Sequence, residues 1–187
     1  AGIVNATTTG NFTATAATSN AAANTAFTIA ANAAEVVDLS NITGGNGYSV
    51  TSTGTGAITG SLAVDILTNT SGSATYLGGA GNDAFTNSAD TMTLNDLSGS
   101  DSVVNAAGAT VNATTTANFL ATAVTRNAAA NTAFTIAADN AESVNLAAVT
   151  GGNGYSVTST GTGAITGSLA VDILTNTSNN ATFIGGA

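Results

Sequence analysis

The sequence predicts an all-β protein, a parallel β-solenoid (a β-helix or β-roll) built from short strands in tandem units. Three observations predict it: one long stretch of the chain occurs twice, the apolar residues alternate in short runs, and proline is absent. Many inward positions are alanine or threonine, and such a narrow core favours a coiled parallel stack over a wide sandwich. A chain without proline suits this stack, because every turn must donate backbone N–H groups to the next.

The repeat is long and close. Residues 5–80 align with residues 112–187 at a shift of 107, and the two copies differ at 15 of 76 positions. We therefore divide the chain into a first solenoid unit, residues 1–107, and a second, shorter copy, residues 108–187. Self-similarity at a fixed period is typical of stacked repeats. We expect the chain to be an excerpt of a longer array.

Alternation by two marks the strands, since β-branched and aromatic residues favour a pleated surface. The alanine-rich stretch 14–26 is expected to be irregular or strand, although its alanines leave a short helix open. The side chains expected to point inward are Phe27, Ile29, Val37, Leu39, Tyr48, Val50, Ile58, Leu62, Val64, Ile66, Met92 and Leu94, with Phe134, Ile136, Val144 and Leu146 in the second copy.

The charge balance restricts the partners. Only 6% of the residues are charged, the formal net charge is −9, and Arg126 is the one basic residue. This excludes the Lys and Arg clusters that nucleic-acid binding needs, and it argues against anionic membrane surfaces. The sequence has no apolar run long enough to predict a transmembrane helix. Divalent cations are the natural partners of such a chain.

The residue types also argue against an enzyme. Histidine, cysteine and lysine are absent, so the usual general bases, thiol nucleophiles and Schiff-base amines are missing. The counterpart of Arg126 in the first copy is Ser19, so the two copies share no basic site. A pair of carboxylates, as glycosidases use, is the one catalytic arrangement left open.

One nonapeptide stands out, GGAGNDAFT at residues 78–86. It fills the pattern G-G-x-G-x-D-x-U-x, where U is a large apolar residue, with Gly78, Gly79, Gly81, Asp83 and Phe85. Glycines permit positive φ angles in a tight turn and let carbonyl groups crowd around an ion. Carboxylate and carbonyl oxygens are hard ligands, which suit Ca²⁺ better than transition metals.

A second aspartate follows Asp83 at the spacing of one coil. Asp101 lies two nonapeptide lengths further on, in DLSGSDSVV, which keeps Gly99 but loses the two leading glycines. Strands of neighbouring turns lie about 4.8 Å apart. Two carboxylates at that distance repel by about 3.5 kcal/mol at an effective dielectric of 20, and a cation between them reverses the sign. We predict that Asp83 and Asp101, with Asp90 and Asp96, bind one or two calcium ions.

Two other interpretations stay open at this point. The nonapeptide is also compatible with a plain glycine turn closed by an Asx cap. Asp65 lies two nonapeptide lengths before Asp83, in GSLAVDILT, but the local alternation predicts that Val64 and Ile66 point inward. Asp65 and its copy Asp172 are therefore weaker candidates than Asp83.

GGAGNDAFT resembles the RTX nonapeptide of calcium-binding parallel β-rolls, and its surroundings are similar to repeats of bacterial surface-layer and giant surface proteins. The resemblance implies a β-roll and calcium held by the aspartate and by turn carbonyls. Carried over, the ligands are Asp83, the backbone of Gly79, Gly81 and Asn82, and Asp101 on the next turn. The resemblance also implies type I secretion to the bacterial cell surface, without a cleaved leader.

These observations together predict a structural protein that self-assembles outside the cell, in a surface layer or a filament, through end-to-end or lateral pairing of β edges. The partners are then copies of the chain itself. The alternative is the repetitive stalk of an adhesin with a carbohydrate- or ice-binding face, for which Thr51, Thr53 and Thr55 are the candidates. A cell-surface polysaccharide is a further expected partner.

Overall fold

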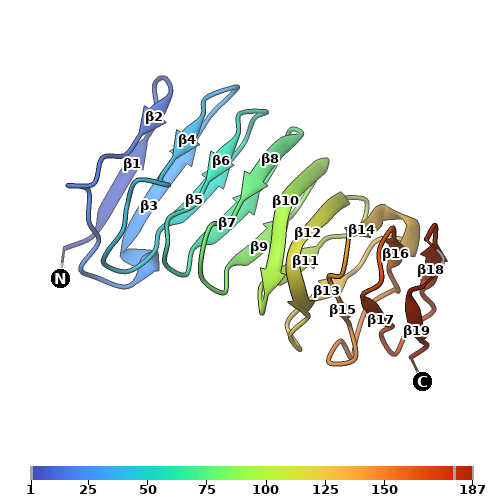
Figure 1. Cartoon of the computed structure of the whole chain (residues 1–187). Helices are drawn as coiled ribbons and strands as arrows, with labels where there is room; N and C mark the ends of the chain where they lie inside the picture. Colours follow the sequence, from blue (N-terminus) through green and yellow to red (C-terminus); the bar gives the residue numbers. More distant parts are fainter. Residues whose placement is uncertain (1, 179, 187) are drawn as a thin grey trace.

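The computed structural model describes residues 2–178 and 180–186, and it is a parallel β-solenoid of about nine turns (Figure 1). The strands stack along the long axis, with the N-terminus at one end and the C-terminus at the other. Strand neighbours pair in parallel throughout this part of the chain. The predicted fold class is confirmed.

Strands form rows that run along the solenoid. The first row is a seven-stranded sheet of β1 (Val4–Thr7), β3 (Phe27–Ala31), β5 (Ser49–Ser52), β7 (Ile66–Asn69), β9 (Ala84–Asn87), β11 (Ser102–Asn105) and β13 (Arg126–Asn127). The second row is β2 (Phe12–Thr13), β4 (Val37–Asp38), β6 (Ile58–Thr59), β8 (Ala74–Leu77), β10 (Thr91–Gly99), β12 (Thr110–Leu120), β14 (Phe134–Ala138), β16 (Ser156–Ser159) and β18 (Ile173–Asn176). A third row, β15 (Val144–Asn145), β17 (Ala164–Thr166) and β19 (Thr182–Ile184), continues the second half of β12.

A coil two nonapeptides long is confirmed in the middle of the first unit, where Ile66 pairs with Ala84 and Ala84 with Ser102. Other turns are longer, since Val4 of β1 pairs with Phe27 of β3. Part of the extra length is taken up by two 3₁₀ turns, η1 (Asn24–Ala26) and η2 (Asn131–Ala133). Residues 14–23 contain no strand, so this alanine-rich stretch is irregular apart from η1.

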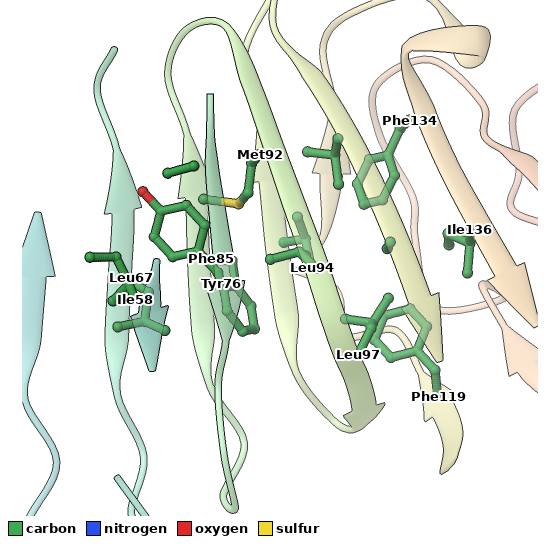
Figure 2. Close-up of a cluster of buried hydrophobic side chains, with 14 of the residues drawn as sticks. Ile58, Leu67, Tyr76, Phe85, Met92, Leu94, Leu97, Phe119, Phe134 and Ile136 are labelled. Carbon is green, nitrogen blue, oxygen red and sulfur yellow. The ribbon is translucent and has the colours of Figure 1, made fainter. Parts of the chain in front are cut away.

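The core is a narrow apolar column between the rows. Leu67, Phe85 and Val103 are buried and lie in register on β7, β9 and β11. In the second row Met92 and Leu94 of β10 are equally buried (Figure 2). Phe27 packs edge-on against Tyr48, with ring centroids 4.9 Å apart. Stacked turns thus bury the alternating residues that the sequence marks.

The predicted alternation is wrong between residues 60 and 66. Leu62 and Val64 are 52% and 47% exposed, and Ile66 is half-buried, while Leu67 is buried. Residues 60–65 form a turn rather than a strand, so they do not carry the period of two into β7. Asp65 is consequently buried, where we expected it to face outward.

The two units do not sit on the same rows. β3, β5 and β7 lie in the first row, but their equivalents β14, β16 and β18 lie in the second. The change follows β10 and β12, long strands that each run from the second row into the third. β6 follows β5 along the chain and lies in the second row, and five steps along that row lead from β6 to β16, the equivalent of β5. One repeat unit therefore makes five turns of the solenoid and advances by one further row.

Asparagines form a second internal column, next to the first row. Asn69, Asn87, Asn105 and Asn127 are buried, and each side-chain Nδ2 donates to the Oδ1 of the next, at 2.9, 3.2 and 3.1 Å. We call this set the asparagine ladder. Its amides also donate to turn carbonyls, such as Asn87 Nδ2 to Thr110 O at 2.7 Å. The ladder ties the corner of each turn to the next.

Two surface expectations are also decided by the fold. Thr51 lies on β5, but Thr53 and Thr55 lie in the following turn, so the predicted row of three threonines on one strand is wrong. Among the described residues no helix is long and apolar enough to cross a membrane.

Candidate functional site

Three aspartates lie one above the other at a corner of the solenoid. Asp65, Asp83 and Asp101 each directly precede a strand of the first row, and they are equally spaced along the chain. Their exposed fractions are 0%, 1% and 2%. We call them the aspartate column. The predicted stacking of Asp83 and Asp101 is confirmed, and Asp65 belongs to the same set.

The column is held by backbone amides of the preceding turn. Tyr48 N donates to Asp65 Oδ1 at 2.6 Å, Asp65 N to Asp83 Oδ1 at 2.7 Å, and Asp83 N to Asp101 Oδ1 at 2.8 Å. Each aspartate therefore bonds through one oxygen to the turn before it. Hydrogen bonds from backbone N–H groups stabilise an ionised carboxylate. They also keep the carboxyl groups pointing into the corner.

The second carboxylate oxygens differ from one turn to the next. Asp65 Oδ2 accepts from Ser61 N at 2.7 Å, and Asp101 Oδ2 accepts from Ser98 N at 3.0 Å. Asp83 Oδ2 is buried and has no hydrogen-bond partner among the described residues. An unpaired buried carboxylate oxygen costs free energy, so it requires a proton, a water molecule or a cation.

The reason for the unpaired oxygen lies in Asp96. Gly79 occupies the place that Ser61 has in the previous turn, four residues before the aspartate. Its amide donates instead to Asp96 Oδ2 at 2.9 Å, and Gly78 N donates to Asp96 Oδ1 at 2.9 Å. Asp96 lies on β10, in the next turn. The Gly78 and Gly79 amides therefore donate to the carboxylate of Asp96 and not to that of Asp83.

Burial raises the pKa values of the three aspartates of the column. Desolvation, with smaller contributions from the charges of Asp101, Asp65 and Asp96, raises the pKa of Asp83 to about 8, against the hydrogen bond from Asp65 N. Desolvation likewise raises the pKa of Asp101 to about 6, and it raises the pKa of Asp65 above its usual range. The corner therefore favours protons or a cation over bare charges.

The glycines of the turn are needed for close stacking. Gly79 and Gly81 have φ angles of 91° and 126°, which side-chain-bearing residues rarely adopt. A Cβ on Gly79 would lie 2.2 Å from Ser61 O, and one on Gly78 would lie 2.4 Å from Asp83 Oδ2. The GGAGND turn therefore packs directly on the GSLAVD turn below it.

Of the predicted ligands, Asp90 lies away from the column, and the side chain of Asn82 faces outward. Asp90 is exposed in the turn between β9 and β10, and it accepts a hydrogen bond from Gly72 N at 2.7 Å. Asn82 is exposed and accepts from Ser100 N at 3.3 Å. Among residues 2–178 and 180–186 no group of three acidic side chains is placed to hold a metal ion. A calcium ion here would need backbone carbonyls as well as carboxylates.

The donor set fits calcium in part. Asp83 offers a buried oxygen that accepts no hydrogen bond. The carboxylate of Asp96 lies close enough for its charge to raise the pKa of Asp83. The other polar atoms at the corner are oxygens and backbone N–H groups, of which only the oxygens could bind a cation. These hard oxygens would suit Ca²⁺ and would not suit a soft metal. Asp83 and Asp96 are the residues that would hold it, with carbonyls of the GGAGND turn.

The second unit repeats the GSLAVD turn and its hydrogen bonds. Asp172 accepts from Tyr155 N at 2.8 Å and from Ser168 N at 2.7 Å, as Asp65 does from Tyr48 and Ser61. It precedes β18, in the second row, so it lies on another side of the solenoid. Both of its oxygens are paired.

Sequence reasoning missed the asparagine ladder and the pairing serines. The signal for the ladder is present, since Asn69, Asn87 and Asn105 recur at the same interval as the aspartates. It is difficult to recognise in a chain so rich in asparagine. No protein-family model, curated protein or solved structure matches this chain.

Proposed function

We propose that the protein is an extracellular structural scaffold that self-assembles from tandem β-solenoid units into a surface layer or filament. The observation that carries the proposal is the junction of the two units. β10 of the first unit pairs with β12 of the second along most of its length, so the ladder of strands runs from one unit into the next. A continuous ladder transmits rigidity along the array.

Calcium stabilises this scaffold at the aspartate column. The support is the free buried oxygen of Asp83, the raised pKa of Asp83, and the resemblance of GGAGNDAFT to a calcium-binding turn. A bound ion replaces the missing hydrogen bond and removes the repulsion between Asp83 and Asp96. One site of this kind is supported in the first unit, rather than a full row of ions.

Copies of the chain are the proposed partners. The GSLAVD turns of both units carry an exposed apolar side chain, Leu62 and Leu169, which are 52% and 51% exposed. Unpaired strand edges favour pairing with a further strand. The cell surface of a bacterium, reached by type I secretion, is the location that the resemblance supports, with a surface polysaccharide as anchor.

A role without catalysis agrees with the residue types, because the chain contains no histidine, cysteine or lysine. The stalk of an adhesin remains the second candidate. One observation favours it: Thr51, Thr68 and Thr86 follow one another in register on β5, β7 and β9, and all three are half-buried. Such a column offers hydroxyl groups at regular spacing to a sugar or to ice.

Electron microscopy of the purified protein tests the proposal. We expect ordered sheets or fibres in calcium and their loss in excess EGTA. Assemblies that survive EGTA would keep the scaffold and remove calcium from it. Dispersed particles in both conditions would contradict self-assembly and favour the stalk, whose binding to polysaccharide or ice is then measured directly.

A further inference from the structure

Two asparagines of the chain are followed directly by glycine, Asn46 and Asn153. They are equivalent residues of the two units, and each lies in a GGNG turn. Asparagine is one of the chemically labile residues of proteins. Glycine has no Cβ to shield its backbone nitrogen, so this nitrogen can approach the side-chain amide of the preceding residue. Each turn therefore places an electrophile, the asparagine Cγ, beside an unshielded nucleophile.

The glycine is required by the stacking of the solenoid, whereas the asparagine of the first unit is not. A Cβ on Gly47 would lie 1.9 Å from Val64 O, and the second unit has the same contact at the same distance. Asn46 is exposed and is held through its backbone, since Asn46 N donates to Asn20 O at 2.7 Å. Among the described residues its side chain takes part in no hydrogen bond.

The equivalent asparagine of the second unit is held by its side chain. Asn153 Nδ2 donates to Ala129 O at 2.7 Å and to Ala128 O at 3.3 Å. The backbone that follows is the same in both units, since the equivalent residues Asn20 and Asn127 each donate to the carbonyl of the glycine, at 2.7 and 2.8 Å. The two turns thus share one backbone arrangement and differ in the freedom of the asparagine side chain.

The nitrogen of Gly47 is also available for reaction. Gly47 lies outside the strands, and within residues 2–178 and 180–186 its N–H group donates to no acceptor. The N–H of the next residue, by contrast, is engaged, because Tyr48 N donates to Asp65 Oδ1 at 2.6 Å. An N–H group that is bonded in a strand ladder is not free to turn towards a side chain. The N–H of Gly47 has no such restraint.

We propose that Asn46 is a site of spontaneous covalent modification, at which Gly47 N attacks Asn46 Cγ and expels the side-chain amide as ammonia. The bond from Gly47 N to Cγ forms as the bond from Cγ to Nδ2 breaks, and the amide proton of Gly47 ends on the departing ammonia. Solvent water then opens the cyclic imide. Water that adds at Cγ gives aspartate, and water that adds at the main-chain carbonyl gives a β-aspartyl linkage. This chemistry needs neither calcium nor assembly, so it is independent of the scaffold function.

The product changes the corner at which the aspartate column begins. Gly47 lies close to the carboxyl group of Asp65, since a Cβ on Gly47 would lie 2.8 Å from Asp65 Oδ1. Either product replaces a neutral amide by a carboxylate and so adds one negative charge to a chain whose formal net charge is −9. The β-aspartyl product also lengthens the main chain by one methylene group. Both changes disfavour the hydrogen bond from Tyr48 N to Asp65 Oδ1.

Peptide mapping by mass spectrometry tests the proposal. The folded chain is incubated in mildly alkaline buffer with EGTA, and the conversion of amide to acid is followed at Asn46, at Asn153 and at Asn87, which is buried in the asparagine ladder. We expect Asn46 to convert about fivefold faster than Asn153, the factor that corresponds to the net contribution of one hydrogen bond, about 1 kcal/mol. Asn87 should stay unconverted over the same time.

The same chain unfolded in urea is the matched control. Residues 43–71 are identical to residues 150–178, so Asn46 and Asn153 should convert at equal rates once the fold is lost. Rates that differ in the folded chain and become equal in urea therefore support an effect of the fold. Asn46→Gln changes an exposed side chain, so this variant should fold as the parent does. It should lose the rapid conversion at position 46 and keep the rate at Asn153.

Two results would overturn the proposal. One is conversion at Asn46 that is no faster than at Asn87 in the folded chain, and the other is equal conversion at Asn46 and Asn153 in the folded chain. Hydrogen exchange of the Tyr48 amide measures the consequence for the aspartate column. We expect this exchange to become faster as the product accumulates in the parent chain and to stay constant in Asn46→Gln. Unchanged exchange in the converted parent would contradict the effect on the column.

Discussion

The two units of the chain are a natural comparison, because nearly the same sequence occurs in two settings. Phe27 and Tyr48 pack edge-on at 4.9 Å with an interplanar angle of 68°, and Phe134 and Tyr155 do so at 4.8 Å and 62°. Yet Phe27 is half-buried and Phe134 is fully buried. Local packing follows from the sequence, while burial follows from the turn stacked alongside.

The aspartates show the same contrast. Asp65 and Asp172 accept equivalent hydrogen bonds from a serine and a tyrosine amide. Asp65 is followed by Asp83 and Asp101 at the interval of one coil, and the three form the aspartate column. Asp172 accepts the same kinds of hydrogen bond outside this column, so it provides a control within the chain.

The largest effect is expected from the aromatic pair. Phe134→Ala removes a fully buried ring and should lower the free energy of unfolding by about 3–5 kcal/mol. Phe27→Ala, the same change in the first unit, should cost roughly half as much, because Phe27 is only half-buried. Urea denaturation of the two variants measures the difference. Equal losses would mean that the neighbouring turn does not determine the contribution of the ring.

The pH dependence sharpens the comparison of the aspartates. In the folded chain the pKa values of Asp83 and Asp101 are raised to about 8 and about 6, so the folded state binds protons more tightly than the unfolded state. In EGTA the stabilisation from protonation is complete below pH 4 and is lost as the pH rises to 8. The loss continues to about pH 6 for Asp101 and to about pH 8 for Asp83, because each group stops losing protons above its folded pKa.

Substitution identifies the group responsible. Asp83→Asn should flatten the dependence between pH 6 and 8, because the amide does not titrate there. Asp172→Asn is the matched control and should leave the dependence as it is. Thermal unfolding in EGTA at a series of pH values follows both variants. A curve that Asp83→Asn does not change would refute the raised pKa of Asp83.

A smaller effect is expected in the asparagine ladder. Asn69 is fully buried and bonds to Asn87, whereas its equivalent Asn176 is exposed on β18. Asn69→Ala should destabilise the chain by about 1–3 kcal/mol, since buried partners lose their bonds. Asn176→Ala should stay within about 0.5 kcal/mol of the parent. Chemical denaturation compares them, and equal effects would mean that the ladder contributes little.

Much of the fold was predictable from the chain. The parallel solenoid and the coil of two nonapeptides follow from the spacing of residues such as Asp83 and Asp101, because a regular coil brings equal steps in sequence to one corner. The buried position of Asp65 was not predictable by alternation. The turn 60–65 interrupts the strand, and a pattern of period two gives no sign of that interruption.

The site could be predicted only in part. The motif identifies Asp83, but the unpaired oxygen depends on Asp96 of another turn, which takes the amides of Gly78 and Gly79. The rotation of the second unit was also beyond the sequence. It arises where β10 and β12 extend into the third row, and such a long-range register is set by packing rather than by local pattern.

Calcium titration by isothermal calorimetry tests the central claim, that calcium stabilises the scaffold at Asp83, most directly. The parent chain, Asp83→Asn and Asp172→Asn are titrated at pH 9, where the Asp83 carboxyl is largely ionised. We predict saturable binding to the parent and to Asp172→Asn, with at least tenfold weaker binding to Asp83→Asn. Binding unchanged in Asp83→Asn, or no binding by the parent, would contradict the account.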